Sequence, residues 1–379
     1  MAVAVSLRSA LFTALLTSVL APAQAPNPAQ GLAQPAQLSP AAQPSAAPQL
    51  SQPGSTQPTA PSSRAMHLSL TLTGDASTNL QNGSIRVLDN GAPLPTEGLQ
   101  PMQSGSAPTH VLLVIDDVNA RLTTIAYERD QLKKFFTRNE GHLSVPIGIA
   151  IMTDTKTEVQ QGFSQNGIAE NDALQNYKIG LHEIRRDSQY GGFDRTDIGV
   201  KTLLQLVAYA ATIPGHKLIL FVSPGWPLLS GPSIELTAKE QSGIFNTVVK
   251  LQNALLRSNT TISMVNPFGP AENLVRSDYY QSFLKGVKKT GDVDIADLSL
   301  QVIAVHSGGT VQQGTSDIGN MVDRAVADLN HGYTLTFQPA ATEDRVTYHR
   351  LQVEGNPPGV AVRTPDEYYE APSAAGTER

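Results

Sequence analysis

The sequence contains no cysteine and only one tryptophan among 379 residues. The absence of cysteine excludes disulfides, zinc–thiolate sites and thiol nucleophiles together. Charged residues are also scarce, at 16% of the chain with a formal net charge of −6, and this mildly acidic balance argues against a nucleic-acid partner. Without disulfides the folded part depends on its hydrophobic core, and about 300 residues are enough to bury one.

Residues 1–25 have the layout of a secretory signal peptide. A single charged side chain, Arg8, is followed by the apolar run ALFTALLTSVL and the small-residue sequence APAQA, with cleavage predicted after Ala23. The apolar run is shorter than the roughly 20 residues that span a bilayer, so no transmembrane span is expected after cleavage. An uncleaved anchor is the alternative. We therefore predict a secreted, periplasmic or cell-envelope protein.

Residues 26–65 are predicted to be a disordered linker. No charged residue occurs between Pro26 and Ser63, and ten of the 26 prolines lie between Pro22 and Pro61. A segment of Ala, Pro, Gln and Ser cannot bury enough apolar surface to offset the entropy of ordering it. The folded region is therefore expected to begin after this linker.

Short β elements are predicted on both sides of a longer α/β region. Residues 66–108 contain the alternating strand MHLSLTLTG and an Asp-Asn-Gly hairpin turn. Residues 341–379 contain two strands and the acidic tail PDEYYE. Because a short hairpin is not stable alone, we expect Leu68–Leu88 and Val346–Val362 to pair with each other or with a sheet edge.

Residues 109–340 alternate between buried strands and amphipathic helices. The runs HVLLVI, VPIGIAIMT, HKLILFV and TTISMV are apolar throughout, as in parallel strands that are covered on both faces. Helices are predicted at 124–139, 167–184, 196–215, 243–259, 295–309 and 316–330. The alternation predicts an α/β fold with a doubly wound, mainly parallel sheet and a strand, YTLTFQP, near its end.

This order of elements, opening with VLLVIDDVNARL, resembles the von Willebrand factor A (VWA) domain over about residues 109–340. More specifically, the chain resembles the bacterial, acidobacterial-type VWFA-related proteins, through the sequences VLDNGAPLP, SGG, YTLTFQP and YHRLQVEGNPPGVAVRT. The resemblance implies an exported protein whose sheet carries a metal-ion-dependent adhesion site at its carboxyl edge. Three loops supply the ligands of such a site: Asp-x-Ser-x-Ser, a threonine and an aspartate.

The expected metal ligands are only partly retained in this sequence. Asp116 occupies the first aspartate position, but Val118 and Ala120 stand at the two serine positions. Thr196 fits the threonine position, whereas Pro224 stands where the last aspartate is expected. Mg²⁺ requires about six oxygen ligands. We therefore predict a degenerate site without a bound ion, in which Asp116 is hydrogen-bonded to backbone N–H groups or to Thr196; Mg²⁺ or Mn²⁺ binding is the alternative.

The loops at this edge form the predicted binding surface, which we call the rim. The rim consists of Asp116–Asn119, Arg195–Asp197 and Ser223–Leu229. Its candidate binding residues are Asp116, Asp117, Asn119, Thr196, Asp197, Ser223 and Trp226. An unknown protein or cell-envelope component is the predicted partner. A cation-dependent adhesin that recruits Asp117 or Asn119 into a rearranged Mg²⁺ or Mn²⁺ site is the alternative.

Trp226 lies in the Pro/Gly-rich loop SPGWPLLSGP, just after a predicted strand. Ligands bind at this edge of α/β sheets. If exposed, Trp226 with Leu228 and Leu229 would form a hot spot for a protein partner. Otherwise the indole packs onto the neighbouring helix.

We predict that the protein is not an enzyme. The sequence contains no Gly-x-Ser-x-Gly elbow and no phosphate-binding Gly-Lys-Ser/Thr loop, and its eight histidines show no paired spacing of the kind that binds a metal. A hydrolase with an unrecognised site is a further alternative. The cluster of Asp292, Asp294 and Asp297 lacks the remaining ligands of a calcium loop and is interpreted equally well as helix capping.

Overall fold

The structure, a computed structural model, describes most of the chain from residue 64 to residue 370. The described residues are 64–74, 80, 85–103, 108–177, 189–232, 234–267, 278–313, 315–339, 345–354 and 360–370. The predicted signal peptide and nearly all of the predicted linker lie outside these residues. In the part of the chain that is described, no helix is both long and apolar enough to cross a membrane.

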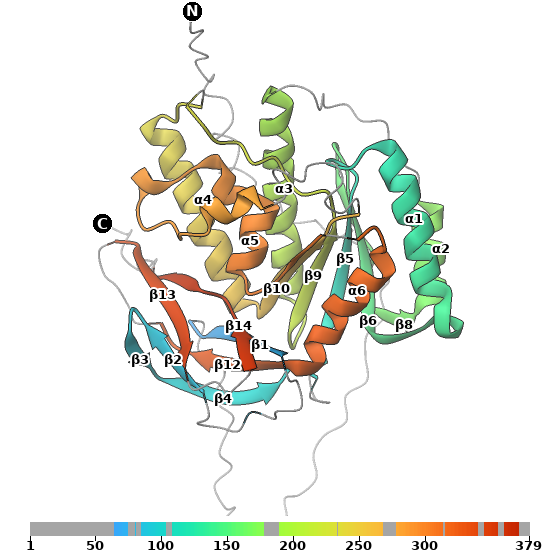
Figure 1. Cartoon of the computed structure of the whole chain (residues 1–379), viewed down its shortest axis with the longest axis horizontal. Helices are drawn as coiled ribbons and strands as arrows, with labels where there is room; N and C mark the ends of the chain where they lie inside the picture. Colours follow the sequence, from blue (N-terminus) through green and yellow to red (C-terminus); the bar gives the residue numbers. More distant parts are fainter. Residues whose placement is uncertain are drawn as a thin grey trace, which may run out of the picture. The chain divides into compact units, whose positions relative to one another are not determined.

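A seven-stranded, mainly parallel sheet forms the centre of the fold, in the order β11-β10-β9-β5-β6-β7 with β8 beside β6 (Figure 1). Its strands are β5 (His110–Asp116), β6 (His142–Met152), β7 (Thr157–Val159), β8 (Ser164–Asn166), β9 (Lys217–Val222), β10 (Thr260–Val265) and β11 (Val311–Gln312). Strands β7 and β8 run antiparallel to β6, and the other neighbours are parallel. The carboxyl ends of β5, β6 and β9 consequently lie at one edge.

Helices cover both faces of this sheet (Figure 1). On one side lie α1 (Leu122–Thr137), α2 (Gly167–Asn176) and α6 (Ile318–Ala327). On the other side lie α3 (Gln189–Ala210), α4 (Ala238–Arg257) and α5 (Leu300–His306). The predicted stripe on the first helix is confirmed, because Ile125, Leu132, Phe135 and Phe136 are all buried. The predicted helix at 167–184 ends earlier, at Asn176, because Tyr177 is in an extended conformation; residues 178–184 lie outside the described residues.

The predicted helix at 295–309 is wrong as a single element. It is divided into a 3-10 helix, η6 (Ile295–Leu298), and α5, with Ser299 in an extended conformation between them. Asp294 caps η6 through a reciprocal capping box with Asp297, so the capping interpretation of this acidic cluster is confirmed. The other short 3-10 helices are η2 (Arg138–Gly141), η4 (Tyr279–Phe283), η5 (Thr290–Asp292) and η7 (Asp328–His331).

Two antiparallel sheets combine strands from the two flanks of the sequence. One has the order β14-β1-β12-β4, with β1 (Met66–Gly74), β4 (Thr96–Pro101), β12 (Gly332–Phe337) and β14 (Val360–Arg363). The other has the order β15-β13-β2-β3, with β2 (Arg86–Asp89), β3 (Ala92–Leu94), β13 (Thr347–Glu354) and β15 (Glu367–Glu370). The predicted pairing of the flanks is therefore confirmed. The strand YTLTFQP belongs to the first of these sheets rather than to the central one.

Two local predictions for the second antiparallel sheet have different outcomes. The hairpin turn is confirmed, because Asn90 and Gly91 have φ angles of 49° and 85°. The acidic tail is wrong: Glu367–Glu370 is strand β15, and all four of its residues are buried. Its carboxylates are accommodated because histidines from α5 and β13 lie against them, a pairing that local composition does not reveal.

Candidate functional site

The rim is built where the parallel strands β5 and β9 end side by side. Asp116 is the last residue of β5 and is fully buried. Ser223 follows β9 directly, and its hydroxyl donates a 2.6 Å hydrogen bond to Asp116 Oδ2. The polar contact at the end of β9 is therefore made by Ser223, one residue before Pro224, where the VWA pattern expects an aspartate.

The loop after β5 folds back over the same carboxylate. The backbone N–H groups of Val118 and Asn119 donate to Asp116 Oδ1 at 3.1 and 2.9 Å. The Asn119 side-chain amide donates to Oδ1 and Oδ2 of Asp116 at 3.2 and 3.0 Å. Both carboxylate oxygens thus receive protein donors, and the predicted backbone hydrogen bonds are present.

Burial and hydrogen bonding act in opposite directions on this carboxyl group. Burial raises the pKa of Asp116 because the charged form loses its water. The hydrogen bonds from Ser223, Asn119 and Val118 lower it, and burial outweighs them. The pKa of Asp116 is therefore raised overall, although hydrogen bonds from the loop after β5 and from Ser223 surround the carboxyl group.

Thr196 does not join Asp116. It lies in the first half of α3 and is 4% exposed, and its hydroxyl donates a 3.0 Å hydrogen bond to the carbonyl of Gly192 one turn earlier. The predicted alternative of an Asp116–Thr196 hydrogen bond is therefore wrong. Thr196 satisfies its hydroxyl within its own helix because a carbonyl four residues back is within easy reach of a threonine side chain.

The residues present at the rim do not fit a hexacoordinate Mg²⁺ or Mn²⁺ ion. Val118 and Ala120 are buried apolar side chains, and Pro224 offers no side-chain oxygen. The two oxygens of Asp116 already accept hydrogen bonds from Ser223 and Asn119. An ion would have to displace those donors and draw most of its ligands from water.

The other predicted rim residues contact each other or neighbouring helices. Arg195 donates from Nε to Asn119 Oδ1 at 3.2 Å, which ties the start of α3 to the β5 loop. Asp197 accepts a 2.6 Å hydrogen bond from Lys201 one helical turn later. Asp117 is 3% exposed, and its backbone N–H donates to Met152 at the end of β6. Asp116, Asn119 and Ser223 are therefore brought together, whereas Asp197 points to its own helix.

Glu128 is a buried residue beside the rim that the sequence interpretation missed. It lies on α1, is fully buried, and neither carboxylate oxygen has a hydrogen-bond partner among the described residues. Burial raises its pKa well above the usual value, and the nearby charges of Asp116 and Asp117 raise it further. The sequence does contain a signal: Glu128 falls on the helical stripe of Ile125 and Leu132, where a charged residue is out of place.

Trp226 is not an exposed hot spot. It is 2% exposed, and its ring packs over Gly199 of α3 and meets Phe221 edge-on with centroids 5.9 Å apart. The expectation that the indole packs on a neighbouring helix is confirmed. Leu228 and Leu229 are partly exposed and remain available on the rim.

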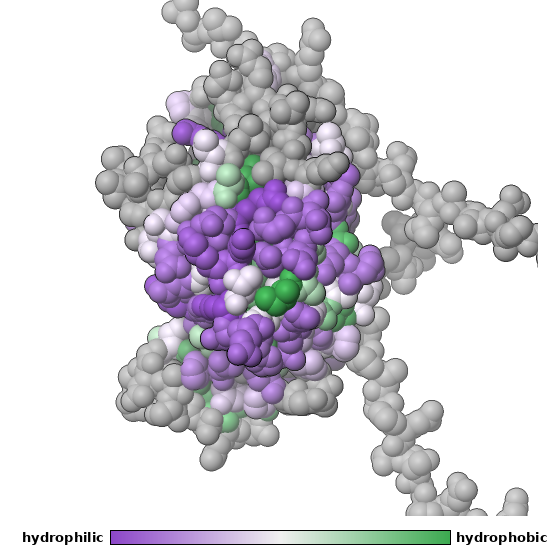
Figure 2. Space-filling model, turned by 90° about the vertical axis from the view of Figure 1, so that its right-hand side faces the viewer, coloured by the Kyte–Doolittle hydropathy of each residue, from purple (hydrophilic) through white to green (hydrophobic). Residues whose placement is uncertain are grey.

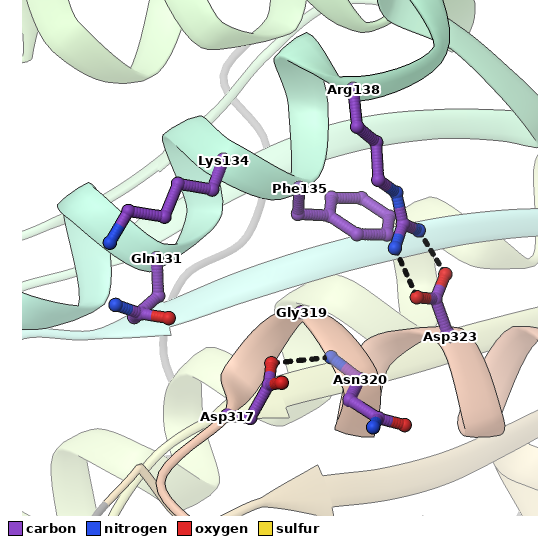
Figure 3. A pocket seen from close by; sticks show the side chains of 8 residues that line it. All are labelled: Gln131, Lys134, Phe135, Arg138, Asp317, Gly319, Asn320 and Asp323. Carbon is purple, nitrogen blue, oxygen red and sulfur yellow. Dashed lines mark hydrogen bonds and ion pairs between the residues drawn. The ribbon is translucent and has the colours of Figure 1, made fainter.

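A groove lies between α1 and α6, and we call it the α1–α6 groove. It is lined by Gln131, Lys134, Phe135, Arg138, Asp317, Gly319, Asn320 and Asp323 (Figure 3). Its open volume is about 480 Å³. Arg138 stacks 4.5 Å from the centroid of Phe135 and forms a bidentate ion pair with Asp323 that bridges the two helices (Figure 3). The face that carries these helices is mostly hydrophilic (Figure 2). The Phe135 ring is the apolar part of the lining, and the Arg138 guanidinium covers it.

No family model matches the chain, and no curated protein matches it either. Among solved structures it is similar to the PilB minor pilin from Streptococcus sanguinis, at 11% identity over 62% of each chain with a TM-score of 0.31. It is similar to von Willebrand factor type A from Catenulispora acidiphila, at 9% identity over 83% of this chain and 76% of that chain, with a TM-score of 0.30. The pilus adhesin SpaC from Lactobacillus rhamnosus GG gives 8% identity, 81% and 48% coverage and a TM-score of 0.34. The chain thus spans less than two thirds of PilB, and likeness at these scores carries no argument about function.

Proposed function

We propose that this chain is an exported, non-enzymatic VWA-like interaction module that binds a protein or cell-envelope component through the rim without a divalent cation. The observation that carries the proposal is the closed hydrogen-bond shell of Asp116. Ser223 and Asn119 donate hydrogen bonds to its carboxylate, at the position where a bound cation contacts the carboxylate in an adhesion site. The rim is held in shape by protein donors alone.

The composition of the rim supports binding of a protein. Arg195 is half-buried beside Asn119, and Leu228 and Leu229 are partly exposed near it. Arginine and accessible apolar side chains around a polar centre are typical of interface hot spots. The rim also lies at the carboxyl edge of the parallel strands, the usual binding edge of an α/β sheet.

The described histidines do not form the relay of a serine hydrolase. His216 is hydrogen-bonded to the Thr261 hydroxyl, while His306 and His349 are hydrogen-bonded to carboxylates. In the part of the chain that the structure describes, no histidine bonds both a hydroxyl and a carboxylate. A serine-hydrolase relay needs one histidine to do both.

Capture from the source organism's envelope fraction tests the proposal. The immobilised full chain should retain a partner equally well with and without EDTA, and Leu228→Asp on the rim should abolish retention. Ile168→Asp is the matched control: Ile168 is also an apolar surface residue, 43% exposed, but it packs beside Gly141 at the amino end of β6. Equal retention by both variants would contradict the assignment of the rim.

Calorimetric titration tests the absence of a rim cation. Wild-type protein and the Asp116→Asn variant should give the same Mg²⁺ and Mn²⁺ titration curves, because no ion is expected to bind at Asp116. The triple variant Val118→Ser, Ala120→Ser, Pro224→Asp restores five ligand positions and should bind one of these ions. Partner capture that EDTA abolishes, together with wild-type Mg²⁺ binding lost in Asp116→Asn, would favour the cation-dependent adhesin that recruits Asp117 or Asn119.

A further inference from the structure

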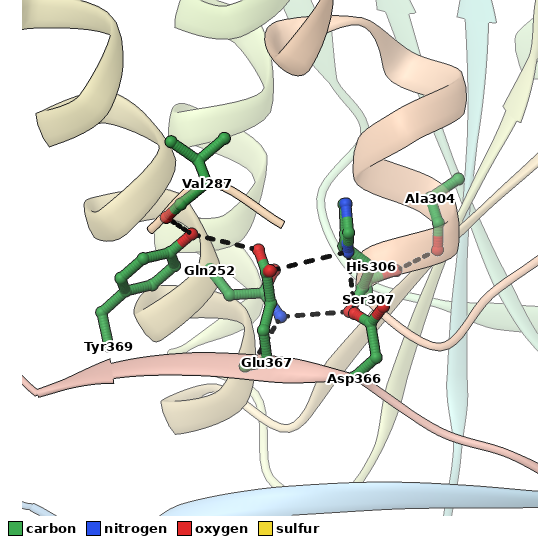
Figure 4. Close-up of polar contacts among 8 residues, drawn as sticks. All are labelled: Gln252, Val287, Ala304, His306, Ser307, Asp366, Glu367 and Tyr369. Carbon is green, nitrogen blue, oxygen red and sulfur yellow. Dashed lines mark hydrogen bonds and ion pairs between the residues drawn. The ribbon is translucent and has the colours of Figure 1, made fainter. Parts of the chain in front are cut away.

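A second polar cluster, made of residues outside the rim, lies where α5 ends against the start of β15. His306 is the last residue of α5, and Asp366 and Glu367 stand at the beginning of the last described strand (Figure 4). His306 Nδ1 lies 2.7 Å from Asp366 Oδ1 and 3.9 Å from Glu367 Oε2. One ligand atom from each of the three side chains lies within 4.8 Å of the other two.

Glu367 is not satisfied by the protein around it. Its side chain is 3% exposed, and Oε1 accepts a 3.2 Å hydrogen bond from the Tyr369 hydroxyl. Among the described residues, Oε2 forms no hydrogen bond of normal geometry; it faces His306, and its other polar neighbour is the Tyr348 hydroxyl, which interacts with Glu367. The imidazole is bonded to Asp366, so this buried oxygen keeps at most the poorly aligned contact with Tyr348, which is costly.

We propose that His306, Asp366 and Glu367 bind a divalent transition-metal ion such as Zn²⁺, with water completing the coordination shell. Zinc takes imidazole nitrogen and carboxylate oxygen at about 2.0–2.2 Å, which places tetrahedral donors about 3.3 Å apart. The present separations of 2.7 and 3.9 Å fall on either side of that value. The third separation, between the Asp366 and Glu367 oxygens, is at most 4.8 Å, so the side chains must rotate toward a common centre to form the site.

The surroundings of the cluster are suited to hold the ligands. Gln252 of α4 donates from Nε2 to the carbonyls of His306 and Glu367 at 3.1 and 3.0 Å (Figure 4). The Tyr369 hydroxyl lies 3.2 Å from Glu367 Oε1 and 2.9 Å from the carbonyl oxygen of Val287, so its single hydrogen is shared between these two acceptors. Such outer contacts fix the orientation of metal ligands. The Asp366 side chain is 45% exposed and gives an ion a path from solvent.

Metal binding at this cluster requires the release of protons. Hydrogen bonding and the nearby carboxylates of Asp366, Glu367 and Asp297 raise the pKa of His306 to about 9 against the opposing effect of burial. Burial raises the pKa of Glu367 to about 7, and Tyr369 and His306 act against that rise. A ligating imidazole is neutral and a ligating carboxylate is ionised, so an ion competes with the proton on His306, and below about pH 7 also with the proton on Glu367.

The proposed ion would fasten β15 to α5 and is independent of partner binding at the rim. The test is Zn²⁺ titration of EDTA-treated, desalted full chain at pH 8. We expect one site, weakened at least about tenfold in Glu367→Gln and in Asp366→Asn. His349→Gln is the matched control, because His349 also faces two carboxylates but does so from opposite ring nitrogens and cannot chelate.

Two further measurements keep the result unambiguous. Anomalous diffraction from wild-type crystals soaked in Zn²⁺ should place an ion between the three side chains, whether or not the variants fold; ions found only elsewhere would overturn the proposal. Equal affinity in wild type and both cluster variants would also overturn it. The Asp116→Asn variant should bind Zn²⁺ like wild type. The proposed zinc site and the proposed binding surface at the rim can therefore fail independently of each other.

Discussion

Ser223 donates a 2.6 Å hydrogen bond to Asp116 Oδ2 and so joins the ends of the neighbouring parallel strands β9 and β5. The same hydroxyl accepts a 3.0 Å hydrogen bond from the backbone N–H of Gly225. One small side chain therefore stabilises both the buried carboxylate and the loop that follows β9.

Ser223→Ala should lower the free energy of unfolding by about 1–3 kcal/mol, because it leaves a buried carboxylate oxygen and the Gly225 N–H short of a partner. Urea unfolding measures this change. Ser230→Ala is the control, since its hydroxyl donates to the partly exposed Asp294 and its loss should cost less. Equal stability of wild type and Ser223→Ala would show that the loop does not need this hydroxyl.

Gly199→Ala should destabilise the protein by about 1–3 kcal/mol through overpacking. A Cβ at this position would lie 2.7 Å from the indole ring of Trp226, well inside van der Waals contact. Trp226 is the only tryptophan, so its fluorescence reports unfolding at this contact directly. Gly291→Ala is the control, because a Cβ there meets nothing within 4 Å. If the two variants unfold alike, the close approach of Trp226 to α3 is wrong.

As pH rises, the free energy of unfolding should fall less in Glu128→Gln than in wild type. The folded pKa of Glu128 is raised well above the ordinary value of 4.5, so the folded state holds a proton that the unfolded state releases. Its contribution is most favourable below pH 4.5 and is lost as pH rises toward the folded pKa. Unfolding free energies from pH 4 to 8 should diverge in favour of the variant. Parallel curves would contradict the buried, protonated state.

His306→Gln should cost stability most below pH 6.5 and least above pH 9 in metal-free buffer. The folded pKa of about 9 exceeds the ordinary 6.5, so the stabilisation is complete below 6.5 and is lost as pH rises through 9. Glu367, raised from 4.5 to about 7, loses its contribution in the same direction as pH rises. Thermal melts across pH 5–10 measure this. The exposed His142 serves as the control position, and His142→Gln should leave the profile unchanged.

The central sheet could be predicted because its signal is local. Runs such as HVLLVI are apolar throughout, and α1 carries Ile125 and Leu132 on one stripe, so strand and helix periodicity sufficed. The break at Ser299 was missed because the apolar period continues across it, and only the capping of η6 by Asp294 ends the first segment.

The sites were less predictable because their contacts are distant in sequence. Ser223 and Asp116 are 107 residues apart, so the sequence places Ser223 on the rim but does not indicate that its hydroxyl bonds Asp116. The sequence PDEYYE resembles a solvated tail, and its burial depends on His306, 60 residues before Asp366. Composition cannot indicate such a pairing, since either partner alone is typical of a protein surface.

The two antiparallel sheets also set an order for folding. Strand β1 pairs with β12 and β14, and β2 pairs with β13, so both early strands need partners from the end of the chain. The parallel strands β5 to β10 can associate before those partners exist. Until β13 and β14 emerge, β1 and β2 expose strand edges, which are prone to aggregate. Folding is therefore expected to finish slowly and only after synthesis of the last strands.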